Sequence, residues 1–374
     1  MSSIKLKHSS GNGVSITAPD TNPSSDRTLK LPSTDADGLI TTKDSSNSLQ
    51  AVTGANGTAF SNRNLLINGA HIVWQRGTSV SGGSALDNFQ RATDRFWLYS
   101  PSSSSGTVGQ STDAPSGFLY STHNNLDAEC IIGSNVELLK TGSDAPFVNG
   151  ESLTLSFYIK STSARSGVAI AISTRDNAGG TGSVDRASGI TFNSTTGWTR
   201  VEKTFTLSGT VGGSNKMLQF EFNLAIGDRV TGFQLEKGTI ATDFEHLPIA
   251  YELALCQRYT IAFDLLCSVD NFMVLCQGRW FSGSQAQCYL PFPNEMRELP
   301  TIEAVSTSAV GNFFLNNDGG LGGAAMTSLV INERSLKGVT FTCENGATSN
   351  AQGLGTTIYS NGNNDAKLVI AAEL

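Results

Sequence analysis

The feature that most constrains this fold is a series of short segments in which apolar and polar residues alternate. Alternation with a period of two is typical of a β-strand that buries one face. Segments rich in Gly, Ser and Asn separate them and favour turns. Regular short strands of this kind predict an antiparallel β-sandwich or jelly roll. The segments are residues 128–139, 152–160, 167–174, 199–207, 217–226 and 229–235.

The last of these segments leads into a different pattern. Residues 230–236 alternate as a strand, and Lys237-Gly238 then favours a turn. Pro248 suits the first turn of a helix. The apolar residues that follow recur at helical spacing, which predicts a short linking helix over 248–260 with one apolar face. That face comprises Ile249, Leu253, Cys256 and Tyr259.

Further strand-like segments lie on both sides of this series. On the N-terminal side, Leu65–Gly69 and Ile72–Trp74 are predicted as strands around an Asn-Gly turn, followed by a strand at Asp94–Tyr99. On the C-terminal side, residues 261–374 predict a second β-rich domain. Its strand candidates are residues 272–275, 279–281, 286–290, 329–331 and 368–370.

Residues 1–62 have a weaker pattern. Ser, Gly, Asn, Asp and Thr dominate, and the apolar residues form fragments at 4–6, 14–16, 29–31 and 39–40. Such fragments cannot bury enough surface alone to offset chain entropy. We expect them to order against a docking partner or other copies of the chain. The predicted fold is therefore all-β, with an extended N-terminal anchoring segment (1–62), a jelly-roll or β-sandwich (63–247), a linking helix (248–260) and a C-terminal β-rich domain (261–374).

Composition excludes several classes of function. Only 15% of the residues are charged and the formal net charge is -7, which argues against nucleic-acid binding. No secretory signal and no run of 18 apolar residues occurs, so we expect no membrane insertion and synthesis in a host cytoplasm. The six cysteines have neither zinc-pair nor disulfide-scaffold spacing, which favours buried reduced thiols and no metal site.

Catalytic motifs are also missing from the sequence. It has no GxSxG, HExxH or Walker pattern. Glycan hydrolysis needs two carboxylates that flank a sugar, and neither the pair Glu295 and Glu298 nor Asp318 has a companion constellation. We therefore predict that the protein is not an enzyme.

Four aromatic residues are candidates for stacking on sugar rings: Trp97, Tyr99, Trp198 and Trp280. A core position is the favoured alternative for Trp97, as for Trp74, and packing at a strand start is the alternative for Trp198. Asp94 and Glu236 lie near strand ends and are the candidate ligands if a structural calcium is bound.

Several strings resemble a known group of proteins. IKLKHSSGNGVSITAPDTNPSSDRTLKLP, at the N-terminus, resembles virion structural proteins and tail fibres of marine, cyanobacterial-type tailed phages. NLLINGAHIVWQRGTS and VTGFQLEKGTIATDFEHLPIAYELALCQRY resemble the two ends of a β-sandwich of phage fibres, and FPNEMRELPTI a loop in the unit that follows. The sandwich is also similar, more loosely, to galactose-binding-like carbohydrate-binding modules.

The resemblance implies a homotrimeric bacteriophage virion appendage on the tail or capsid surface. Trimerisation would also supply partners for the N-terminal fragments. In this hypothesis residues 1–62 bind other virion proteins, and the β-domains bind a host-surface glycan or protein receptor without catalysis. The alternatives are a structural decoration or connector protein that binds no receptor and, less favoured, a glycan-cleaving tailspike.

Overall fold

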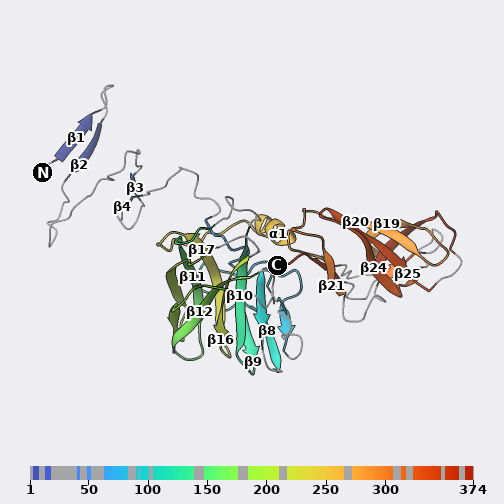
Figure 1. Ribbon diagram of the computed structural model, residues 1–374, viewed down its shortest axis with the longest axis horizontal. Helices are drawn as coiled ribbons and strands as arrows, with labels where there is room; N and C mark the ends of the chain where they lie inside the picture. The colour runs from blue at the N-terminus through green and yellow to red at the C-terminus, as the bar shows by residue number, and fades with distance from the viewer. Residues whose placement is uncertain are drawn as a thin grey trace. The chain divides into compact units, whose positions relative to one another are not determined.

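The computed structural model has two compact units, Met1–Ser61 and Asn62–Leu374. The described residues are 63–82, 90–91, 93–100, 104–138, 147–175, 184–209, 217–264, 272–305, 313–316, 323–346, 350–361 and 367–373, together with four strands before residue 62. These residues form antiparallel strands and a single α-helix, which confirms the predicted all-β class (Figure 1). The helix is too short to span a membrane, and the described chain has no other.

In the first unit, the described strands pair with each other within one chain. Strand β1 (Ser3–Lys7) pairs antiparallel with β2 (Gly13–Thr17), with Ile4 opposite Ile16. Strand β3 (Ile40–Thr42) pairs with β4 (Leu49–Ala51). The apolar fragments at 4–6 and 14–16 and residue Ile40 thus belong to paired strands, whereas residue 39 and the fragment at 29–31 lie outside the described residues. Attachment through this unit stays a prediction.

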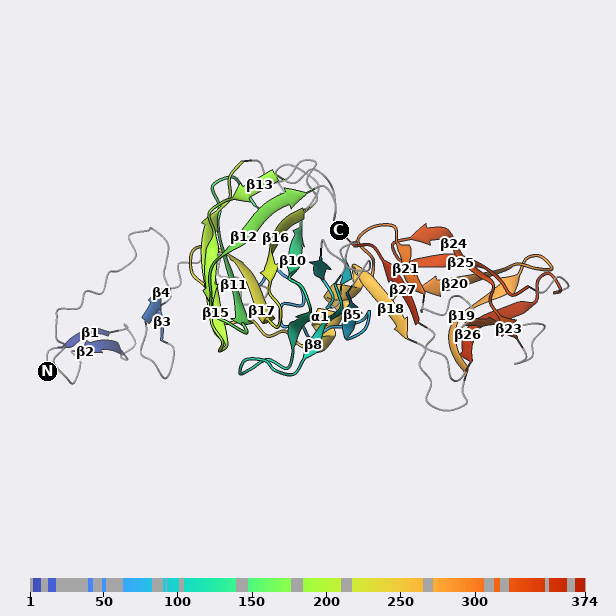
Figure 2. The same ribbon diagram turned by 90° about the horizontal axis from the view of Figure 1, so that it is seen from below.

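The second unit begins with a sandwich of two sheets, which can be followed from blue-green to yellow in Figures 1 and 2. Sheet I has the order β13-β12-β16-β10-β7-β6, with β14 also paired to β12, and sheet II has the order β15-β11-β17-β9-β8-β5. The chain changes sheet between β9, β10, β11 and β12, as expected for a jelly roll. The strands are β5 (Ser79–Ser81), β6 (Gln90–Arg91), β7 (Phe96–Tyr99), β8 (Gly106–Ser111), β9 (Ser121–Leu126), β10 (Cys130–Glu137), β11 (Ser152–Lys160), β12 (Arg165–Arg175), β13 (Val184–Ala187), β14 (Thr191–Ser194), β15 (Thr199–Thr206), β16 (Met217–Leu224) and β17 (Arg229–Lys237).

Alternating apolar residues from the two sheets form the core between them. Leu153, Leu155, Phe157 and Ile159 of β11 are all fully buried, as their period of two predicted. The ring of Phe157 stacks on Phe222 of sheet I and on Phe233 of sheet II, with centroids 4.9 and 5.2 Å apart. The predicted β-sandwich is therefore confirmed.

The prediction of two strands around Asn68-Gly69 was wrong. Residues 63–78 form turns and irregular structure, in which Asn68 and His71 have positive φ angles of 61° and 51°. In place of strand-to-strand hydrogen bonds, the fully buried side chain of Asn68 bonds to the backbone of this segment. It accepts hydrogen bonds from the N–H groups of Ile72 and Val73, and it donates to the carbonyls of Val73 and Asp94. Burial lowers the pKa of His71 to about 3, so this histidine is neutral in the core.

The linking helix is present as α1 (Ile249–Gln257), but its buried face differs from the predicted one. Cys256 and, just after the helix, Tyr259 are buried as expected, whereas Ile249 is 63% exposed. Glu252, not an apolar residue, is the other buried helix residue, because its Oε2 accepts the N–H of Asn68 at 2.8 Å. A hydrogen bond to the sandwich, invisible in the apolar spacing, therefore sets the orientation of the helix.

The C-terminal region has two sheets, in the orders β18-β27-β21 and β23-β22-β26-β19-β20-β25-β24. Its core includes the buried Cys276, Cys288 and Cys343. The five described cysteines are free and buried, as predicted, and Cys267 lies outside the described residues. The strands are β18 (Thr260–Asp264), β19 (Phe272–Trp280), β20 (Ala286–Pro291), β21 (Thr301–Val305), β22 (Phe313–Leu315), β23 (Ala324–Ala325), β24 (Ser328–Ser335), β25 (Gly338–Glu344), β26 (Gly355–Asn361) and β27 (Lys367–Ala371).

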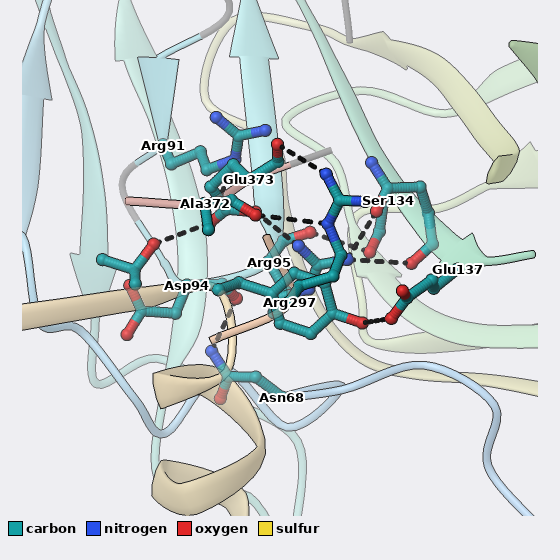
Figure 3. Close-up of polar contacts among 12 residues, drawn as sticks. Asn68, Arg91, Asp94, Arg95, Ser134, Glu137, Arg297, Ala372 and Glu373 are labelled. Atoms are coloured by element: carbon teal, nitrogen blue, oxygen red, sulfur yellow. Dashed lines mark hydrogen bonds and ion pairs between the residues drawn. The ribbon is translucent and has the colours of Figure 1, made fainter. Parts of the chain in front are cut away.

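A buried ionic cluster joins the sandwich to the C-terminal region (Figure 3). Its centre is Glu373, just after β27, whose carboxylate pairs with Arg76 at 3.1 Å, with Arg91 at 3.5 Å and with Arg95. Arg76 also pairs with Glu303 of β21 at 2.6 Å. Burial raises the pKa of Glu373, but the three guanidinium groups outweigh it and hold that pKa well below its usual range.

Candidate functional site

The outer face of sheet I carries polar and small side chains at its centre. Because Leu218, Phe220, Phe222 and Leu224 of β16 point into the core, Gln219, Glu221 and Asn223 belong to the opposite face. The strand register places Glu221 between Gly133 of β10 and Ala171 of β12, and Asn223 opposite Ile131. The resulting surface has hydrogen-bonding side chains next to the small residues Gly133 and Ala171, which leave space above the sheet.

A groove of about 600 Å³ lies over this face. Ala169 and Ala171 in its lining are small and exposed, Asn223 is exposed, and Ile131 and Glu221 are half-buried. Its volume is within the range typical of small-ligand sites. The described lining residues are Ile131, Arg165, Ser166, Gly167, Val168, Ala169, Ala171, Glu221, Phe222 and Asn223.

The polar groups of the groove are held in place by neighbouring side chains. Oε2 of Glu221 accepts a hydrogen bond from Nε2 of Gln219 at 2.6 Å and lies 3.7 Å from Nη2 of Arg175. At the other side, Nη1 of Arg165 pairs with Oδ2 of the buried Asp228 at 2.7 Å. The groove therefore offers an oriented carboxylate acceptor, guanidinium donors and the amide of Asn223, which together can bond to hydroxyl groups of a ligand.

Two of the predicted aromatic residues lie on this same face. Tyr99 is opposite Ile131, which lines the groove, and it is half-buried. Trp97 is opposite Gly133, but its side chain is only 2% exposed. A Cβ on Gly133 would lie 2.3 Å from Cζ2 of Trp97, so the indole rests directly on the glycine. Trp97 therefore supports the face and offers no free ring for stacking, whereas Tyr99 borders the groove.

The other two predicted aromatics lie elsewhere. Trp198 precedes β15 and donates from Nε1 to Asp113, which also binds Lys160 on the outer side of sheet II. Trp280 is fully buried in the C-terminal core and donates to the carbonyl of Asn316. The structure thus brings Trp97 and Tyr99 together and separates both from Trp198 and Trp280, and burial rules out stacking by Trp280.

The two candidate calcium ligands bind protein donors. Oδ1 of Asp94 pairs with Nη1 of Arg76 at 3.0 Å, and Glu236 accepts the N–H of Thr242 at 3.0 Å. A cation would compete with the guanidinium at Asp94, which is unfavourable. No cluster of three metal-ligating side chains occurs among the described residues.

The groove residues Arg165, Glu221 and Asn223 were missed by sequence reasoning. A signal for two of them existed, because the apolar alternation of β16 already assigns Glu221 and Asn223 to one outer face. What the sequence does not contain is the register that places this face beside Ala171, Ile131 and Tyr99.

Residues 87–228, which include every strand of the groove, match the family model of a carbohydrate binding domain, CBM_4_9. The sandwich is carbohydrate-binding-module-like. No curated protein matches the chain.

Solved structures with similarity to the chain include carbohydrate-binding modules and a phage protein. The CBM22-1 xylan-binding domain from Paenibacillus barcinonensis Xyn10C is 12% identical, with 49% of this chain and 100% of that chain covered and a TM-score of 0.27. The enzymatically active domain of tailspike protein 4 from bacteriophage CBA120 is 17% identical, with 43% of this chain covered and a TM-score of 0.27. The match spans 21% of that tailspike chain.

Proposed function

We propose that the protein binds a glycan in the groove on the outer face of the carbohydrate-binding-module-like sandwich. The observation that carries the proposal is the position of this groove within residues 87–228, which match a carbohydrate binding domain. Glu221, Asn223 and Arg165 supply acceptors and donors for sugar hydroxyls, and Tyr99 at the border supplies an amphipathic ring.

We further infer that the site binds without catalysis. Among the described residues that line the groove, Glu221 is the single carboxylate. Hydrolysis by the usual mechanisms requires two carboxylates on either side of the glycosidic bond. A groove with one carboxylate, held in place by Gln219 and Arg175, favours binding of a glycan without cleavage. Release of reducing sugar from a bound polysaccharide would contradict this inference and favour the tailspike alternative.

Filling the groove tests the binding site. Ala171 is exposed and its neighbours leave space above it. Ala171→Trp should weaken glycan binding on an array of host-envelope polysaccharides by at least about tenfold in affinity, because the indole occupies the ligand volume. Ala325→Trp, at an exposed position of β23 in the C-terminal region, is the matched control and should bind as the unmodified protein does. Equal binding by both variants would place the site elsewhere.

On the scale of the particle, we propose a virion appendage whose first 62 residues attach it and whose β-domains present the groove to a host surface. The support is the resemblance of the N-terminal strings to phage fibres, together with the separate compact unit Met1–Ser61. A homotrimer is the assembly that this resemblance implies.

Deletion of residues 1–62 tests the attachment. We expect the shortened protein to keep glycan binding and to be lost from purified particles, as measured by immunoblotting. Incorporation at the normal level would contradict the anchoring role. Light scattering that finds a monomer at micromolar concentration would contradict the trimer, and failure of residues 63–374 to compete with infection would favour a decoration protein.

A further inference from the structure

A second hollow, separate from the groove, lies at the open edge of the sandwich. It has a volume of about 540 Å³ and is bordered by β13, β14 and β15, where the edges of sheets I and II meet. Two cationic residues, Arg186 and Lys203, line it together with the hydroxyl-bearing residues Ser188, Thr191, Thr204, Thr206 and Ser208.

Arg186 is a buried cation that has no carboxylate partner within the part of the chain that the structure describes. The residue is only 7% exposed. Its Nε donates to Oγ1 of Thr174 at 2.7 Å and its Nη1 to the carbonyl of Ser208 at 3.4 Å. No carboxylate within the described residues forms an ion pair with it. A buried charge without a counter-ion raises the free energy of the folded protein. An anion bound to this fixed guanidinium would lower that free energy.

Lys203 directs a second charge toward the same hollow. In β15 it lies two positions from both of the buried residues Val201 and Phe205, so it shares their inward face of the edge strand, whereas Glu202 belongs to the outer face. Lys203 also has no carboxylate partner among the described residues. Inward-pointing charges on edge strands can serve to prevent sheet-to-sheet aggregation. That role needs one charge at the edge, and does not account for a buried guanidinium beside it.

We propose that this hollow, formed by Arg186, Lys203 and their hydroxyl neighbours, binds an anionic substituent of a polysaccharide. A uronate carboxylate and a sulfate ester share the chemistry that the site recognises: negatively charged oxygens that accept several hydrogen bonds at once. Arg186 and Lys203 supply the charge, and Thr191 and Ser188 supply hydroxyl donors at the rim. The hollow lies apart from the groove, and the assignment of a polysaccharide as the carrier of the anionic group rests on the proposed glycan binding.

Binding of defined polymers to the full chain tests the proposal. The probes are polygalacturonate for carboxylate, dextran sulfate for sulfate and unsubstituted dextran as the neutral polymer. At least one polyanion should bind with an affinity that falls as salt rises, and Lys203→Gln should weaken that binding about tenfold. Which polyanion binds distinguishes the carboxylate from the sulfate source. Lys337→Gln, at a lysine whose side chain is 77% exposed, is the matched control and should leave the affinity unchanged.

Arg186→Lys provides a second variant, because it keeps the charge but loses the fork of donors, and its melting temperature reports whether the edge still folds. Ala171→Trp should leave polyanion binding intact, which separates this site from the groove. The proposal is overturned if neither polyanion binds, if Lys203→Gln and Lys337→Gln lose affinity equally, or if only free inorganic phosphate binds.

Discussion

Glu373→Gln should lower the free energy of unfolding by about 3–5 kcal/mol, because it leaves three buried guanidinium groups with one carboxylate fewer. The carboxylate of Glu373 lies among Arg76, Arg91 and Arg95 with its side chain 8% exposed, and it ties the end of β27 to the sandwich. Urea denaturation measures the loss, and proteolysis should cut the joint between the two regions first. The amide keeps the shape of the side chain, so the effect reports the charge.

The same group predicts a dependence on pH. The pKa of Glu373 is lower in the folded protein than its ordinary value of 4.5, so the unfolded chain takes up a proton first as the pH falls. Its contribution to stability is complete above that ordinary value and is lost progressively in more acidic solution. Glu373→Gln should remove this part of the acid sensitivity. Glu333→Gln, at an exposed position of β24, should change neither stability nor its pH profile.

Gly133→Ala should destabilise the sandwich by about 1–3 kcal/mol and also weaken glycan binding. A Cβ at this position would lie 2.3 Å from Cζ2 of Trp97 and 2.7 Å from the carbonyl oxygen of Phe220. The backbone oxygen is held in place by the pairing of the central strands β10 and β16. The indole must therefore move to make room for the Cβ. A displaced Trp97 changes the outer face beside Glu221. Chemical denaturation and tryptophan emission would both record the change.

Gly355→Ala is the control for this substitution. A Cβ at Gly355, at the start of β26, meets no atom within 4 Å. It should therefore alter stability by no more than the usual glycine-to-alanine effect of about 1 kcal/mol. If Gly133→Ala were as mild as Gly355→Ala, the close packing of Trp97 on the outer face of sheet I would be refuted.

The strands of the sandwich were predictable because their physical cause is local. In β11 and β16, alternate residues must enter the core, and the apolar series beginning with Leu153 and Leu218 records this directly. The strand prediction around Asn68 was wrong because the physical cause of that segment's conformation is not local. The backbone groups of this segment form hydrogen bonds with the buried amide of Asn68 and with Glu252, which lies 184 positions later in the chain than Asn68. No window of neighbouring residues contains that interaction.

The candidate site shows the same division. The sequence by itself determined the all-β class, the helix near residue 250, the buried thiols and the presence of aromatic residues at 97 and 99. Only the tertiary structure decided that Trp97 is covered while Tyr99 borders a groove, that Trp198 lies on the other sheet, and that Arg186 and Lys203 share a hollow. Periodicity assigns a side chain to a face, but strand register and sheet packing, which depend on residues far apart in the chain, decide what that face meets.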